Sequence, residues 1–132
     1  MLSAALAHSV AEAADQPESA MASIRGLIGN ADCNDDSQCR TMAIGTKPCG
    51  GPEAYLAWST TNTDANALEL AVTNYNLERQ KEIRRFGLLS NCAMVDDPGA
   101  VCAPTATPDL KSGGPRACRL RSARQGAANS IR

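Results

Sequence analysis

Six cysteines in a chain of 132 residues constrain the fold more than any other feature of this sequence. Disulfides and zinc are the two common structural uses of such a set, and zinc sites pair their ligands at C-x₂₋₄-C spacing. Here the closest pair, Cys33 and Cys39, has five intervening residues, and the only histidine, His8, is far from every cysteine. The sequence therefore predicts three disulfides, no metal and no other cofactor, and it indicates an oxidising compartment.

The pairing of the cysteines is only partly suggested by their positions. We expect a disulfide between Cys102 and Cys118, because it closes a loop rich in proline and glycine at its base. The other four cysteines allow three pairings. Of these we favour Cys39–Cys49 together with Cys33–Cys92.

The acidic stretch "CNDDSQC" resembles the opening of a calcium loop, because Asp32, Asn34 and Asp36 alternate. An EF-hand loop needs glycine at its sixth position and glutamate at its twelfth, and these places hold Ser37 and Ala43. We interpret the stretch as a disulfide-tied turn whose carboxylates accept hydrogen bonds from nearby backbone N–H groups, before a strand that begins at Cys39.

Length and composition favour one domain over residues 30–122, with 43% hydrophobic residues but only one tryptophan, two tyrosines and one phenylalanine for its core. Residues 1–29 have the character of a signal-peptide remnant followed by an N-terminal segment, since "MLSAALAHSVAEAA" is apolar and contains A-x-A patterns. An alanine-rich helix of the mature domain is the alternative. After a break at Pro17, a short amphipathic stretch has helical spacing, and Gly26 and Gly29 limit it to a turn or two. Residues 123–132 are expected to form a disordered tail.

The element pattern predicts an α+β fold, a small antiparallel sheet packed by one long helix. "CRTMAIG" and Ala54–Ser59 are typical strands, and in the second of these Leu56 and Trp58 share the face that we assign to the core. A helix of about six turns follows, capped by Thr63 or Asp64 and closed by Gly87. Its predicted buried stripe consists of Leu68, Val72, Tyr75, Ile83 and Phe86.

Arg79 interrupts this stripe where the helical period calls for an apolar residue. We expect its methylene groups to lie along the core and its guanidinium to reach the rim. The alternative is a buried cation directed at the carboxylate of a partner.

The C-terminal part carries the predicted binding residues. Residues 105–132 hold six basic residues and one acidic residue, a local net charge of +5, although the whole chain has a net charge of −1. The loop from Pro104 to Pro115 and the short strand "RACRLR" after it form the expected recognition surface. Its candidate contact residues are Lys111, Arg116 and Arg119.

Several functions lack the residues that they require. No nucleotide-binding, phosphate-binding or nucleophile-elbow motif is present, and removal of a leader would also remove the only histidine. A carboxylate pair is the remaining catalytic device, with Asp35, Asp36, Glu53, Asp96 and Asp97 as candidates in turns. No aromatic residues interleave with the basic ones, as nucleic-acid binding would need, and no segment is long and apolar enough for a membrane span.

The order Cys-x-x-Asp-x-x-Cys, "PCGGPEAYLAWS", a long helix and cysteines around a "DPG" turn resembles small exported bacterial cysteine-rich domains of uncharacterised function. The resemblance covers about Cys33 to Cys118, implies export and brings no catalytic residues. We therefore expect a secreted or periplasmic binding protein whose partner is another protein, in the form of an inhibitor or immunity factor, and not an enzyme. The alternatives are a carboxylate-using hydrolase of an envelope polymer and a structural envelope component.

Overall fold

The computed structural model describes residues 16–105 and 114–122 of the chain. The elements in chain order are α1 (Gln16–Ile28), the 3-10 helix η1 (Asp36–Gln38), β1 (Cys39–Ile44), β2 (Ala54–Ser59), α2 (Ala65–Phe86), β3 (Ala100–Pro104) and β4 (Arg116–Leu120). β1 pairs with β2 and β3 pairs with β4, in both cases antiparallel. The predicted α+β class is confirmed, with two small sheets in place of the single sheet that we expected.

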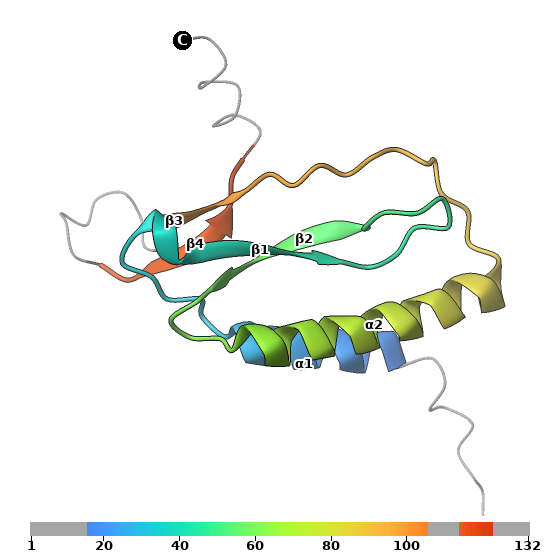
Figure 1. Cartoon of the computed structure of the whole chain (residues 1–132), viewed down its shortest axis with the longest axis horizontal. Helices are drawn as coiled ribbons and strands as arrows, with labels where there is room; N and C mark the ends of the chain where they lie inside the picture. Colours follow the sequence, from blue (N-terminus) through green and yellow to red (C-terminus); the bar gives the residue numbers. More distant parts are fainter. Residues whose placement is uncertain (1–15, 106–113, 123–132) are drawn as a thin grey trace, which may run out of the picture.

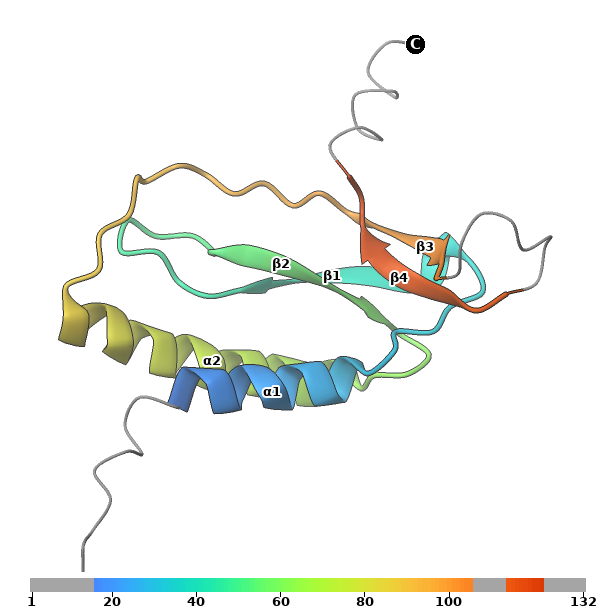
Figure 2. The same cartoon turned by 180° about the vertical axis from the view of Figure 1, so that it is seen from behind.

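The elements form layers around β1 and β2. The two helices lie side by side along one face of this pair, and residues 88–99 cross over the opposite face (Figure 1). The view from behind shows the same order of layers, with β3 and β4 at one end of the molecule (Figure 2). Within the described residues, neither helix is long and apolar enough to span a membrane.

The β1–β2 pair follows the predicted strand pattern closely. Leu56 lies opposite Met42, and Trp58 lies opposite Arg40. These four side chains therefore project from the same face of the strand pair. Trp58 is buried in the core together with Leu68 and Val72 of α2, which confirms the predicted core face. Ser59, on the other face, is also completely buried, and its hydroxyl donates to the carbonyl of Asp32 at 2.6 Å.

Helix α2 begins and ends where its capping residues indicate. The Asp64 side chain accepts a hydrogen bond from the Ala67 N–H, and Gly87 adopts a left-handed conformation with φ of 60° that closes the last turn. The predicted stripe is buried only in the first half of the helix, at Leu68 and Val72. Phe86 is 59% exposed, so its assignment to the core is wrong, because α2 extends beyond the part of the molecule that α1 covers.

Helix α1 belongs to the same core, which corrects the domain boundary expected at residue 30. It is longer than the one or two turns that Gly26 and Gly29 suggested, since Pro17 lies in the first turn, where a missing N–H breaks no helical bond. Ile24 is completely buried and Ile28 also packs in the core. The leader predicted for the first residues and the tail predicted for residues 123–132 lie outside the described ranges.

All six cysteines are paired, but the predicted pairing is wrong at every bond. The disulfides are Cys33–Cys102, Cys39–Cys118 and Cys49–Cys92. Cys102 and Cys118 do lie opposite one another on β3 and β4. Opposite residues of an antiparallel pair project from the same face. Here that face packs against the chain that holds Cys33 and Cys39, so Cys102 and Cys118 each form a disulfide with this chain and not with one another.

The base of the predicted recognition loop is closed by hydrogen bonds in place of a disulfide. The Thr105 N–H and hydroxyl donate to the Pro115 carbonyl at 3.0 and 2.9 Å. Cys118 N–H donates to the Ala31 carbonyl at 2.8 Å and thereby joins β4 to the segment after α1. The two disulfides at this end therefore reinforce a region that backbone hydrogen bonds already connect.

Candidate functional site

Two of the predicted binding residues are described by the structure, and they lie on opposite faces of β4. Arg116 donates from Nη1 to the Asn34 carbonyl and from Nη2 to the Cys102 carbonyl, both at 2.8 Å, so its guanidinium joins β4 to two neighbouring segments. Arg119 is exposed but stands three residues further along the strand, on the opposite face. Lys111 lies outside the described residues. The structure thus gives Arg116 a structural role and leaves Arg119 as a separate surface charge.

The acidic turn is a structural turn, as we interpreted it. Asp35 is the N-cap of η1 and accepts a hydrogen bond from the Ser37 N–H. Hydrogen bonding by the Ser37 side chain, together with this N–H, holds the pKa of the Asp35 carboxyl below its usual value. Gln38 completes the capping box from the other side. Asp36 Oδ1 accepts from the Cys102 N–H at 2.7 Å and connects the turn to β3.

Arg79 forms an ion-pair cluster within its own chain. Its side chain is 24% exposed and is paired with carboxylates of this chain, a pairing that neither interpretation of the sequence included. Its Nε and Nη2 atoms lie 2.8 and 2.9 Å from the two carboxylate oxygens of Glu53, and its Nη1 lies 2.6 Å from Glu82 Oε2. The bond from Arg79 lowers the pKa of Glu53, against the effect of partial burial, and raises the pKa of Arg79 itself. Burial raises the pKa of neighbouring Tyr75.

This ion-pair cluster separates two hollows of the surface. One, of about 370 Å³, lies between the β1–β2 loop and the chain after α2, and it is lined in part by Lys47, Ile83 and Leu89. The other, of about 350 Å³, lies between the helices, next to Met21 and Tyr75. All three guanidinium nitrogens of Arg79 already have carboxylate partners, so the cluster offers neither hollow an uncompensated positive charge.

The end of the molecule beyond this cluster exposes large apolar side chains. We call it the single-disulfide end, and it comprises residues 45–53, the last two turns of α2 and residues 87–94. Leu89 is 98% exposed and Met94 83% exposed, in addition to Phe86. The Cys49–Cys92 disulfide joins the β1–β2 loop to this segment. The sequence pattern missed these residues because it assigned Phe86 to the core and left residues 88–94 without a role.

Positive charges accompany these apolar side chains. The Arg85 guanidinium carbon lies 5.4 Å from the centroid of the Phe86 ring. Arg84 lines a further hollow next to Lys47, whose ammonium group donates to the Ala93 carbonyl. The surface of the single-disulfide end therefore combines exposed apolar groups with cations.

Most of the candidate catalytic carboxylates accept hydrogen bonds that stabilise the fold. Besides Asp35, Asp36 and Glu53, Asp97 accepts from the Thr41 hydroxyl at 2.7 Å and from the Gly99 N–H at 2.9 Å. A general acid at neutral pH needs a raised pKa, whereas hydrogen bonds lower the pKa of both Asp35 and Glu53. These contacts suit the stabilisation of turns and helix contacts.

Comparison with protein-family models, with curated proteins and with solved structures finds no match for this chain.

Proposed function

We propose that this chain is a secreted or periplasmic binding protein that contacts another protein through its single-disulfide end. The observation that carries the proposal is Leu89, a leucine side chain that is almost completely exposed on a segment held by a disulfide. Contiguous exposed apolar groups mark interaction sites on soluble proteins. An inhibitor or immunity factor that inserts such a group into a partner's active site is the most concrete form of this function.

The Cys49–Cys92 disulfide supports this role, because a segment that is already fixed loses little conformational freedom when it binds a partner. Cys92 ties the chain after α2 to Cys49, and Lys47 adds its bond to the Ala93 carbonyl. Leu89 therefore stands between the end of a capped helix and a crosslink. This is the arrangement of a preorganised contact residue.

Export is supported by the three disulfides, since such bonds persist in oxidising compartments and are rare in a reducing cytosol. The alternative function of an envelope-polymer hydrolase has less support, because hydrogen bonds from Ser37 and Arg79 favour the charged forms of Asp35 and Glu53.

The charge of the single-disulfide end suggests the partner's chemistry. Arg84, Arg85 and Lys47 belong to the same end as the apolar groups, and two acidic groups of this end, Glu53 and Glu82, are bound to Arg79. The complementary surface is an apolar pocket with an acidic rim.

The test compares two exposed leucines of the oxidised, full-length chain. A photo-crosslinking residue at position 89 identifies the partner in envelope extract, and the purified partner is then titrated against Leu89→Asp and Leu70→Asp. Leu70 is 74% exposed on α2 and serves as the matched control. We expect Leu89→Asp to weaken binding by at least about tenfold, or 1.4 kcal/mol, and Leu70→Asp to have little effect. Equal loss in both variants, or unchanged binding by Leu89→Asp, would contradict the proposal.

A further inference from the structure

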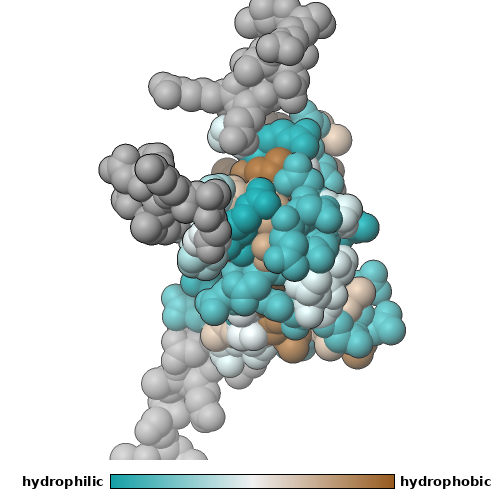
Figure 3. All heavy atoms as spheres, turned by 90° about the vertical axis from the view of Figure 1, so that its left-hand side faces the viewer, coloured by the Kyte–Doolittle hydropathy of each residue, from teal (hydrophilic) through white to brown (hydrophobic). Residues whose placement is uncertain are grey.

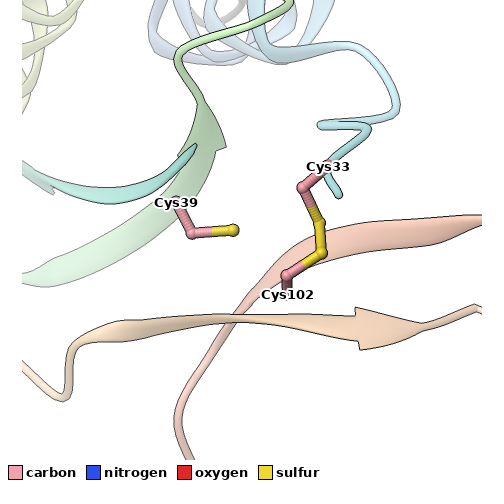
Figure 4. A group of neighbouring side chains, drawn as sticks. All are labelled: Cys33, Cys39 and Cys102. Atoms are coloured by element: carbon pink, nitrogen blue, oxygen red, sulfur yellow. A yellow bond between two sulfur atoms is a disulfide. The ribbon is translucent and has the colours of Figure 1, made fainter. Parts of the chain in front are cut away.

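Three of the cysteine sulfurs form one buried cluster, and the sulfur of Cys118 is bonded to one of them. The Sγ atoms of Cys33, Cys39 and Cys102 all lie within 4.8 Å of one another, and Cys118 Sγ is bonded to Cys39 Sγ. Figure 4 shows the Cys39 sulfur pointing toward the Cys33–Cys102 disulfide. The four residues are each between 5% and 7% exposed. Two disulfides therefore share one site in the core.

The backbone around this cluster is held by bonds that do not involve sulfur. Cys33 N–H donates to the Arg116 carbonyl at 3.1 Å, Cys118 N–H to the Ala31 carbonyl at 2.8 Å, and Cys102 N–H to Asp36 Oδ1 at 2.7 Å. The β3–β4 register places Cys102 opposite Cys118. None of these contacts depends on a sulfur–sulfur bond.

We propose that the reduced chain binds one thiophilic metal ion of the Zn²⁺ class through Cys33, Cys39, Cys102 and Cys118. A tetrahedral zinc site with Zn–S bonds of about 2.3 Å has sulfur–sulfur edges of about 3.8 Å. This edge lies within the 4.8 Å that encloses the first three sulfurs. The ligands come from positions far apart in the sequence, which is why their spacing did not indicate a metal site.

Metal binding requires that both disulfides are first reduced to thiols. Each of the two disulfides takes two electrons and two protons from one molecule of a dithiol reductant, which becomes a disulfide. The protein then holds four thiols. Zn²⁺ displaces their four protons to water and binds four thiolates, and the resulting site carries two negative charges.

Two arginines lie where they can compensate this negative charge. Arg116 Nη2 donates to the Cys102 carbonyl at 2.8 Å, and Arg40 Nη1 donates to the Cys39 carbonyl at 3.0 Å. Asp36, which accepts from Cys102 N–H, acts in the opposite sense. Asp32 and Asp35, which lie close to Cys33 in the chain, act in the same sense as Asp36, so the two arginines offset part of the negative charge around the site.

The experiment uses the full-length chain, reduced with a phosphine that is then removed under nitrogen, and Co²⁺ as the spectroscopic probe. We expect one Co²⁺ per chain with the absorption of tetrahedral thiolate ligation, and displacement by Zn²⁺. Cys33→Ser should weaken binding by at least about tenfold, since even loss of a group that only orients a ligand has an effect of that order. The double variant Cys49→Ser/Cys92→Ser is the control. It should bind Co²⁺ like the unmodified chain, because Cys49 and Cys92 are exposed and do not belong to the cluster.

A second measurement separates an ordered site from incidental binding by free thiols. Zn²⁺ should restore the near-ultraviolet circular dichroism of Trp58 in the reduced chain, and urea should abolish Co²⁺ binding. The proposal is overturned if the reduced chain takes up no Co²⁺, if Cys33→Ser binds as well as the control, or if the chain in urea binds with the same affinity.

Discussion

The two ends of this molecule are built in opposite ways. At the double-disulfide end, which comprises residues 31–39, β3 and β4, four cysteines are buried and Arg116 satisfies two backbone carbonyls. Hydrophilic residues dominate the visible surface there (Figure 3). At the single-disulfide end, Cys49 and Cys92 are exposed and so are Phe86, Leu89 and other apolar side chains.

Helix α2 connects the two ends, and its two halves differ in burial. Its first half contributes Leu68 and Val72 to the core, whereas its second half contributes Arg79 to an ion-pair cluster and ends with exposed Phe86. The difference teaches that the core and the proposed contact surface are separated along the molecule. Crosslinks and apolar burial stabilise one end, which leaves apolar side chains of the other end available for a partner.

The comparison is tested most severely by removing one disulfide from each end. We expect Cys39→Ala/Cys118→Ala to lower the free energy of unfolding by about 4–5 kcal/mol, and Cys49→Ala/Cys92→Ala by about 2–3 kcal/mol. The sequence separations of 79 and 43 residues give similar loop entropies, so most of the difference reflects burial of the first pair. Urea denaturation of both oxidised variants measures it, and equal losses would show that the two ends are equally important for stability.

A change in the core should have the next largest effect. Trp58→Ala should cost about 3–5 kcal/mol, because the ring is 7% exposed and packs in the core. Ile83→Ala, in the second half of α2, should cost clearly less, since Ile83 is only partly buried. Thermal unfolding followed by circular dichroism provides the comparison. Similar costs at both positions would mean that the core extends further along α2 than its burial indicates.

The ion-pair cluster should have a moderate and pH-dependent effect. Arg79→Met should cost about 1–2 kcal/mol at neutral pH, less than a fully buried pair, because the side chains of Arg79 and Glu53 are 24% and 28% exposed. The pKa of Glu53 is lowered in the folded chain, so its contribution is complete above the ordinary glutamate value of 4.5 and is lost as the pH falls through the lowered pKa. The stability difference between the unmodified chain and Arg79→Met should therefore shrink in acid. A difference that is constant from neutral pH to strongly acidic pH would exclude this linkage.

The smallest effect on stability should come from the proposed contact residue. Leu89→Ser should change the free energy of unfolding by less than about 0.5 kcal/mol, because the side chain is 98% exposed. Urea denaturation measures this change next to the partner titrations. A large loss of stability would show that Leu89 packs within the chain in solution and would remove it as a contact residue.

Several elements could be predicted because their signals are local. Asp64 and Gly87 mark the ends of α2, and the alternation in Ala54–Ser59 marks a strand with Trp58 inward. The acidic turn was also predicted correctly, since Asp35 caps a turn that follows directly in the chain. The extent of α1 was underestimated, because contact with α2 outweighs the low helix propensity of Gly26.

What the sequence determined by itself was the set of local structures and the presence of three disulfides, because helix caps, strand alternation and an even cysteine count act over short distances or by number. The tertiary structure alone decided which sulfurs meet. Cys33 reaches Cys102 and Cys39 reaches Cys118 because β4 packs beside β2 and the segment at Ala31. It also decided that Arg79 meets Glu53 and that Phe86 and Leu89 remain exposed, since burial depends on which elements cover a face and not on the period of the residues that form it.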